Sequence, residues 1–407
     1  MLNEKAIDEL IQIVVDRQEN INAWVIKKIA ERIKKIGTVK PSDVRQLIQL
    51  RNTGADTREI VNELSKLTAL QVKEIKQILK FVAMDAYLDA KPFYDFRHKS
   101  FIPYEKNTIL QRRMEAIARQ TANTYMNMSK AQAFMLRDLQ NPKKLIPTPL
   151  SQTYQSVVDE AIQVTQSGVV DYGTAMRRTL KQLVDSGLRT VTYHPESGRT
   201  YTQRMDTALR RNLLDGVRQV NQEMQNIVGE QFGADGVEIS VHVYPADDHA
   251  AMQGHQYTKE EFAKMQEGMN FKDIQGRNYK GFERAVGTLN CRHFAISIVI
   301  GYAKQNYTDE QLSEILRKNK EGYTTANGKH LTMYDCTQEQ RRLETLVRKA
   351  KDGQIAARAA GDEKLAMEYQ AKVNKYTKQY KTFSKACGLG EKPSKMTVSG
   401  YRKIKVF

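Results

Sequence analysis

Apolar residues recur at helical spacing through the first part of the chain. Ile7, Leu10, Ile11 and Val14 follow the spacing i, i+3, i+4, i+7, which places them on one face of a helix over residues 1–36. The same periodicity predicts further helices at 57–67, 68–88, 105–140, 151–186 and 206–232, and a helix start at Pro41-Ser42-Asp43. The front half of the chain is therefore expected to be a helical bundle.

A second kind of pattern interrupts the helices. Residues 187–202 alternate around Pro195-Glu-Ser-Gly198, a combination typical of a β-hairpin. Val237–Val243 alternates cleanly and Phe294–Ile300 is continuously apolar, so both are predicted strands. The segment between these two strands should then lie at one edge of a small sheet.

Links and caps divide the remaining segments. Lys91–Phe96 is interpreted as an aromatic-rich link, and the two prolines in Ile146–Pro149 indicate a stiff connector. Threonine followed three residues later by Glu or Gln predicts helix starts at Thr258, Thr308 and Thr337. Residues 322–333 are interpreted as an irregular hairpin.

Two apolar stripes, after residue 337 and after residue 362, predict an antiparallel helical hairpin near the end of the chain. These patterns together predict a helix-dominated α+β protein. Its expected segments are an N-terminal helical bundle (1–90), a helical partner-binding region (91–186), a mixed domain (187–305) and a basic helical hairpin with a tail (306–407).

The net charge of +17 predicts an acidic partner such as nucleic acid or an acidic protein surface. Residues 302–407 hold 22 Lys and Arg against 12 Asp and Glu, so the last quarter carries over half of the excess. A solvated helical face would explain the same charges equally well. The candidates for nucleic-acid contact are Arg341, Arg342, Arg348, Lys349, Lys372, Lys375, Lys378 and Lys381.

The amino-acid composition also indicates the cellular compartment in which the protein is made. Three widely spaced cysteines do not suggest a disulfide framework and fit a reducing environment. The first ten residues lack the basic and apolar regions of a signal peptide, and the most apolar run, Phe294–Ala303, is about half the length of a bilayer span. We therefore expect a protein that is made in a cytoplasm and has no membrane contact.

The segment from His242 to His293 concentrates the chemistry. Four of the seven histidines and one of the three cysteines lie there. Zinc binding by His249, His255, Cys291 and His293 is one interpretation, because imidazole and thiolate suit tetrahedral coordination. No two of these residues have a diagnostic zinc spacing such as Cys-x-x-Cys.

Two other interpretations of this segment stay open. Its histidines and Arg292 could instead form a polar network with carbonyl groups, Asp247 and Asp248 that pins long loops. The third possibility is catalysis, because Asp248-His249, a central Asn270 or Asn290, and His293 loosely match a His-Asn-His nuclease.

Longer motifs resemble a known family. His249-Ala-Ala-Met-Gln-Gly254-His255-Gln-Tyr257, Asn290-Cys291-Arg292-His293 and Phe383-Ser-Lys-Ala-Cys-Gly388-Leu resemble segments of tailed-phage minor capsid proteins of the "phage minor capsid protein 2" group. This group is related in role to the Mu F-like head morphogenesis proteins. The resemblance covers about residues 100–400, and His242, Asp248 and Gly254 belong to the same segment. An Arg-Pro pair and a Trp common in that group are replaced here within Ala246–Gly254.

The resemblance implies a structural role in the virion. A protein of this kind would be assembled in the host cytoplasm and present in few copies at the portal vertex. It would contact the portal protein, the major capsid protein and packaged double-stranded DNA. It would assist head assembly, genome packaging or genome delivery. The alternative is a metal-dependent nuclease or a transferase carried in the head.

Overall fold

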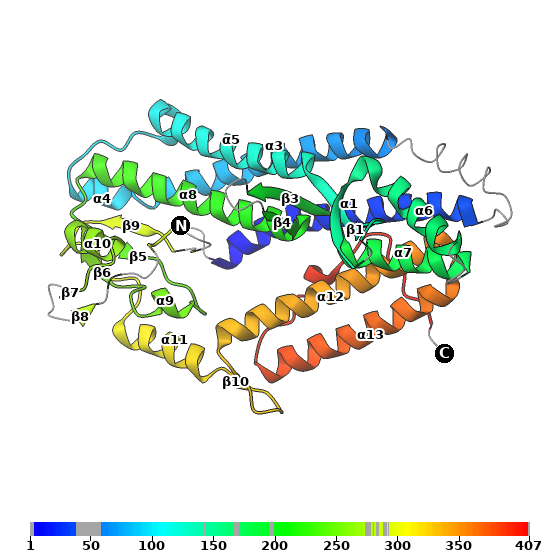
Figure 1. Ribbon diagram of the computed structural model, residues 1–407. Helices are drawn as coiled ribbons and strands as arrows, with labels where there is room; N and C mark the ends of the chain where they lie inside the picture. Colours follow the sequence, from blue (N-terminus) through cyan, green and yellow to red (C-terminus); the bar gives the residue numbers. More distant parts are fainter. Residues whose placement is uncertain are drawn as a thin grey trace. The chain divides into compact units, whose positions relative to one another are not determined.

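The computed structural model describes residues 4–37, 58–141, 143–166, 171–194, 199–272, 278–279, 281, 285–287, 291 and 293–405 (Figure 1). Long helices dominate these residues, and their strands pair antiparallel in small sheets. The helix-dominated α+β class expected from the sequence is therefore confirmed. No helix within these ranges is both long and apolar enough to cross a membrane.

The chain divides into two compact units, each assembled from three separate stretches. Unit 1 comprises Met1–Ile11, Lys73–Thr124 and Arg211–Glu339, and unit 2 comprises Gln12–Val72, Tyr125–Arg210 and Gln340–Phe407. The boundaries fall within long helices, so several helices supply residues to both units. The division into four consecutive segments stays a prediction.

Unit 2 contains a four-stranded sheet and several long helices. Its helical parts are most of α1 (Glu4–Gly37), the start of α3 (Arg58–Leu88), α6 (Leu150–Gln166), α7 (Tyr172–Ser186), most of α12 (Met333–Ala360), α13 (Glu363–Ala386) and η2 (Pro393–Met396). The sheet has the order β2-β1-β3-β4, with β1 at Gln132–Arg137, β2 at Leu145–Pro149, β3 at Arg189–His194 and β4 at Arg199–Arg204. Strands β3 and β4 confirm the predicted hairpin, whose turn lies outside the described residues.

The largest apolar cluster lies in unit 2. Phe134 of β1 is fully buried in it, together with residues of α1, α6, α7, α12 and α13. The predicted helical hairpin is confirmed, because Gln340 near the start of α12 donates a hydrogen bond to Ser384 near the end of α13 at 2.9 Å. A Cβ on Gly353 would lie 2.2 Å from the ring of Tyr369, so the close approach of the two helices depends on glycine.

The strands β1 and β2 correct two expectations from the sequence. The helix predicted over 105–140 ends at Lys130, and Gln132–Arg137 continues as a strand. The prolines of the predicted connector lie in β2, which is one of the two edge strands of the sheet. An edge strand tolerates proline because one side of its backbone needs no N–H donor for the ladder.

Helix boundaries differ from the predictions at three places. Arg58–Leu88 is one helix rather than two. Thr68, at the predicted boundary, lies inside this helix, and its hydroxyl contacts that of Ser129 at 2.9 Å. Lys91–Phe96 forms the short helix α4 rather than a link. Helix α12 begins at Met333, so Thr337 lies inside it, and the predicted start at Pro41 lies outside the described residues.

Unit 1 carries the remaining elements. Its helices include most of α5 (Thr108–Lys130), most of α8 (Met205–Phe232), α9 (Asp247–Ala250), α10 (Lys259–Gln266), α11 (Asp309–Glu321) and η1 (Tyr104–Lys106). Its strands are β5 (Gly236–Ile239), β6 (Gln256–Thr258), β7 (Phe271–Lys272), β8 (Asn278–Tyr279), β9 (Ala295–Ile298), β10 (Tyr323–Thr324) and β11 (His330–Leu331). The capping boxes predicted at Thr258 and Thr308 are both present.

A three-stranded sheet of order β6-β5-β9 organises the histidine-rich segment of unit 1. The central strand β5 pairs antiparallel with both neighbours, and Val237 lies opposite Tyr257 on one side and Ser297 on the other. Strand β5 ends at Ile239, four residues earlier than predicted, so His242 lies in the loop that follows it. The predicted position of this segment between two strands is confirmed.

Candidate functional site

Three buried side chains of unit 1 converge beside the three-stranded sheet. His249 belongs to α9, while Cys291 and His293 directly precede β9. The sulfur atom of Cys291 lies 3.2 Å from Nδ1 of His249 and 3.6 Å from Nδ1 of His293. The exposed fractions are 1% for His249 and 4% each for Cys291 and His293. The structure thus brings together three of the four residues expected to bind zinc, and we call them the His/Cys cluster.

Gln253 fixes the orientation of one imidazole in this cluster. Its Oε1 accepts a hydrogen bond from the backbone N–H of His242 at 2.8 Å, and its Nε2 donates to the carbonyl of His242 at 3.1 Å. Together these two hydrogen bonds show which atom of the Gln253 side-chain amide is oxygen and which is nitrogen. The same Oε1 lies 3.1 Å from Nε2 of His293, so Nε2 must carry the proton. Nδ1 of His293 is therefore left as a lone-pair donor that faces the sulfur atom.

The surroundings of Cys291 stabilise its thiolate. Burial alone would raise the pKa of this thiol, but hydrogen bonds from His249 and from the backbone at Gly287 and His293 lower the pKa below its usual value. On the far side of the His249 ring, Oδ2 of Asp248 lies 4.0 Å from Nε2. The cluster therefore combines a polarised sulfur atom with an imidazole that faces it.

The other predicted residues of this segment lie around the cluster or outside it. His255 does not belong to it, since its Nδ1 lies 3.7 Å from Oδ1 of Asp309. The ring of His242 contacts that of His293, with centroids 4.3 Å apart. Gly254 has a φ of 77° and donates its N–H to the carbonyl of Ile239, so it forms the tight turn that leads into β6. Asn290 and Arg292 lie outside the described residues.

Sequence reasoning missed the role of Gln253. The residue lies within the recognised His249–Tyr257 motif, but a glutamine has no ligand chemistry that would single it out there. Its function depends on the backbone of His242 eleven positions away. Glutamine next to a cluster of histidines is a usable signal, since histidine ligands commonly need an acceptor for their second nitrogen.

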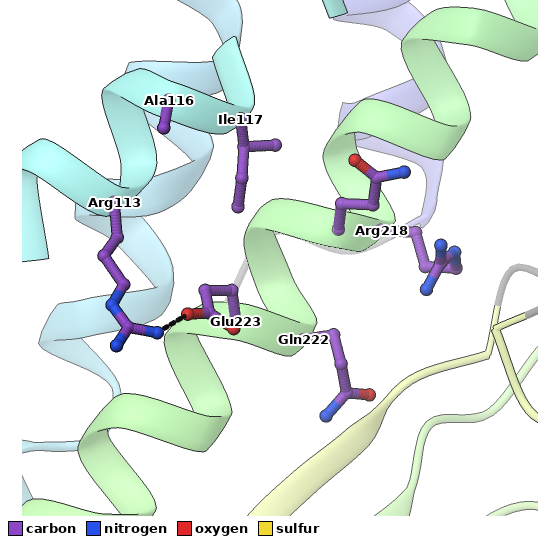
Figure 2. Close-up of a pocket in the computed structure, with 7 residues that line it drawn as sticks. Arg113, Ala116, Ile117, Arg218, Gln222 and Glu223 are labelled. Carbon is purple, nitrogen blue, oxygen red and sulfur yellow. Dashed lines mark hydrogen bonds and ion pairs between the residues drawn. The ribbon is translucent and has the colours of Figure 1, made fainter. Parts of the chain in front are cut away.

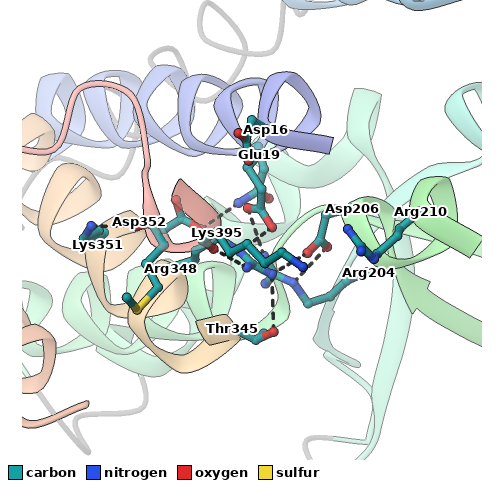
Figure 3. Close-up of polar contacts among 12 residues, drawn as sticks. Asp16, Glu19, Arg204, Asp206, Arg210, Thr345, Arg348, Lys351, Asp352 and Lys395 are labelled. Atoms are coloured by element: carbon teal, nitrogen blue, oxygen red, sulfur yellow. Dashed lines mark hydrogen bonds and ion pairs between the residues drawn. The ribbon is translucent and has the colours of Figure 1, made fainter. Parts of the chain in front are cut away.

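Arg348, one of the candidates for nucleic-acid contact, is buried in the structure. Its guanidinium points into unit 2 rather than outward, where Nε donates to Oε1 of Glu19 at 2.8 Å and Nη2 donates to Oδ2 of Asp206 at 3.0 Å (Figure 3). Arg204 pairs with the same two carboxylates. We call Glu19, Arg204, Asp206 and Arg348 the buried ion network. Arg348 is thus removed from the set that could contact DNA.

Burial and nearby charges set the pKa values of the carboxyl groups in and beside this network. Burial would raise the pKa of Asp206, yet the guanidinium groups of Arg204 and Arg348 hold it far below its usual value. Asp352 is fully buried and accepts a hydrogen bond from Nδ2 of Asn22 at 2.7 Å. Burial raises its pKa to about 7. Burial also raises the pKa of Glu19, well above its usual value. The two guanidinium groups therefore chiefly balance the charge of Asp206, while Asp352 retains its proton below neutral pH.

The remaining basic candidates are less buried than Arg348. Arg342 is exposed, whereas Arg341 and Lys349 are half-buried. The exposed lysines of α13 are Lys372, Lys375, Lys378 and Lys381. Lys372 also places its ammonium 4.8 Å from the centre of the Tyr369 ring. Most of the exposed positive charge among these candidates therefore comes from α13.

A separate depression of about 400 Å³ lies between α5 and α8 of unit 1 (Figure 2). An ion pair at its edge joins Nη1 of Arg113 to Oε1 of Glu223 at 2.5 Å. The lining residues are Arg113, Ala116, Ile117, Arg218, Gln219, Gln222 and Glu223. No residue of the His/Cys cluster is among them, so the depression and the cluster are distinct features.

Comparison with known proteins agrees with the resemblance of the motifs. No curated protein and no solved structure matches the chain. A family model described as phage minor capsid protein 2 matches residues 2–385. The match includes the first 90 residues, which the motif resemblance did not cover, and it spans the His/Cys cluster and most of α13. The chain therefore belongs to the phage minor capsid protein 2 family.

Proposed function

We propose that this minor capsid protein is a low-copy component of the phage head, located at the portal vertex. It would contact the portal protein and the major capsid protein there and assist head assembly, genome packaging or genome delivery. The observation that carries the proposal is the family match over residues 2–385. Quantitative mass spectrometry of purified particles tests it, because a vertex protein must be retained in far fewer copies than the major capsid protein.

We further propose that α13 contacts packaged DNA. Its buried side includes Tyr369, Val373 and Tyr380. Exposed lysines recur every third position from Lys372 to Lys381. Lysine ammonium groups on one exposed helix can neutralise phosphates and release the condensed counterions. The exposed charge of α13 supports an electrostatic contact that does not read DNA sequence.

Replacing Lys375, Lys378 and Lys381 by glutamine is expected to weaken duplex DNA binding by the full-length protein. The loss should be on the order of 100-fold near 0.1 M salt, and the slope of log affinity against log salt should fall by about 0.9 per lost contact. Fluorescence anisotropy over a series of salt concentrations measures both quantities.

A matched control removes the same charge elsewhere. Lys73, Lys76 and Lys80 are exposed lysines of α3, and their replacement by glutamine should leave most of the affinity and the slope intact. Equal losses in the two triple variants would show that net charge alone attracts DNA. In that case α13 is not the contact.

A nuclease or transferase carried in the head is the alternative function, and the His/Cys cluster is the observation that would favour it. Covalent or metal-assisted chemistry on a macromolecule needs a reacting group that the substrate can reach. The three side chains are at most 4% exposed, which favours a structural role. Cleavage of DNA by the wild type, abolished in His293→Ala, would instead support the nuclease.

A further inference from the structure

The His/Cys cluster brings the donor atoms of a metal site close together. The candidate ligand atoms of His249, Cys291 and His293 all lie within 4.8 Å of one another. We propose that these residues bind one zinc ion through Nδ1, Sγ and Nδ1, as a structural centre of unit 1. The inference is independent of the position of the protein in the virion.

The two sulfur–nitrogen distances of the cluster fit a tetrahedral site. Zinc bonds of about 2.3 Å to sulfur and about 2.0 Å to nitrogen, at tetrahedral angles, place a sulfur and a nitrogen ligand about 3.5 Å apart. The two observed separations from the sulfur of Cys291 are 3.2 Å and 3.6 Å. An ion could therefore enter this cluster with only small movements of the three side chains.

Gln253 orients one of the three ligands for metal binding. Gln253 holds the proton of His293 on Nε2, which leaves the Nδ1 lone pair directed at the cluster. Asp248 lies behind Nε2 of His249, at 4.0 Å. A hydrogen-bond acceptor behind the imidazole is the usual outer arrangement of a histidine that binds zinc, since it fixes the tautomer and raises ligand basicity, and Gln253 provides this acceptor to His293.

The donor set selects the metal. One thiolate and two imidazoles suit zinc, whereas calcium and magnesium prefer oxygen ligands. A fourth ligand, either water or the neighbouring His242, would complete the tetrahedron. Residues 249 and 291 are 42 positions apart, so the ion would join α9 to the segment before β9. Such a crosslink stabilises the fold because the unfolded chain has no preformed site.

Metal content of the full-length protein tests the proposal. After incubation with excess zinc and removal of unbound metal, inductively coupled plasma mass spectrometry should find one zinc per wild-type chain. Cys291→Ala and His293→Ala should lose it. Cys336→Ala and His255→Ala are the matched controls, because Cys336 is another buried cysteine and His255 lies outside the cluster, and both should retain it.

Cobalt substitution tests for a thiolate ligand in the wild type itself, so this test does not depend on whether a variant folds. The wild type loaded with Co²⁺ should show the thiolate-to-cobalt charge-transfer band and the intense visible bands of tetrahedral coordination, and Cys336→Ala should match it. Gln253→Ala should weaken zinc binding by about 10- to 100-fold, because the imidazole of His293 loses its orienting acceptor. A wild type that binds no zinc and gives no thiolate band, or a Cys291→Ala variant that binds zinc normally, would overturn the proposal.

Discussion

Replacing Arg348 by alanine is expected to lower the free energy of unfolding of unit 2 by about 3–5 kcal/mol. The guanidinium of Arg348 is largely buried and bridges Glu19 and Asp206, whose side chains are 1% and 6% exposed. Removing it leaves Arg204 as the remaining guanidinium of the network beside the buried Asp206 carboxylate and the Glu19 carboxyl group. The cost comes from stranding buried charge, since a lost surface pair would cost far less.

The effect of Arg348→Ala can be measured by urea denaturation together with hydrogen exchange of amides in unit 2. Arg342→Ala is the matched control, because Arg342 lies on the same helix but is exposed, and its change should stay within about 0.5 kcal/mol. Similar small effects of the two substitutions would contradict the buried ion network. The comparison also tests the removal of Arg348 from the DNA-contact candidates.

Phe134→Ala should destabilise unit 2 by about 3–5 kcal/mol, the usual cost of truncating a buried aromatic residue. Phe134 is 0% exposed and belongs to the largest apolar cluster. Its strand β1 pairs with both β2 and β3, so the cavity would open in an inner strand of the sheet. Surrounding strands and helices limit how far the site can relax.

Met135→Ala is the control for Phe134→Ala. Met135 is the next residue of β1, is only half-buried, and points to the opposite face of the sheet because side chains alternate along a strand. Its truncation should cost clearly less in the same denaturation experiment. A larger loss for Met135→Ala than for Phe134→Ala would mean that the faces of β1 are assigned the wrong way round.

The fold could be predicted from the sequence where local signals agreed. Residues 206–232 have clear helical periodicity, and Thr258 and Thr308 have capping boxes that the structure contains. Strand β1 could not be predicted, because its apolar run follows an amphipathic helix without a glycine or proline between them. Its strand conformation depends on pairing with β2, whose prolines suggested a connector, and with β3, more than 50 residues later in the sequence.

For the candidate site, the sequence indicated the segment but not which of its residues lie in contact. The concentration of histidine and cysteine directed attention to residues 242–293, where three of the four zinc candidates lie together. Which of these residues lie close together depends on the path of the chain between β5 and β9. The sequence therefore could not show that His255 lies outside the cluster or that Gln253 contacts His293. The burial of Arg348 could not be predicted for the same reason, since it depends on Glu19, 329 positions away.

Quantitative mass spectrometry of purified phage particles tests the central claim, a low-copy structural role in the head, most directly. Peptides from this chain would be counted against those of the portal protein and the major capsid protein in the same digest. We expect the chain to remain through particle purification in a fixed ratio to the portal protein and in far fewer copies than the major capsid protein. Its absence from intact particles, or a copy number equal to that of the major capsid protein, would contradict this account.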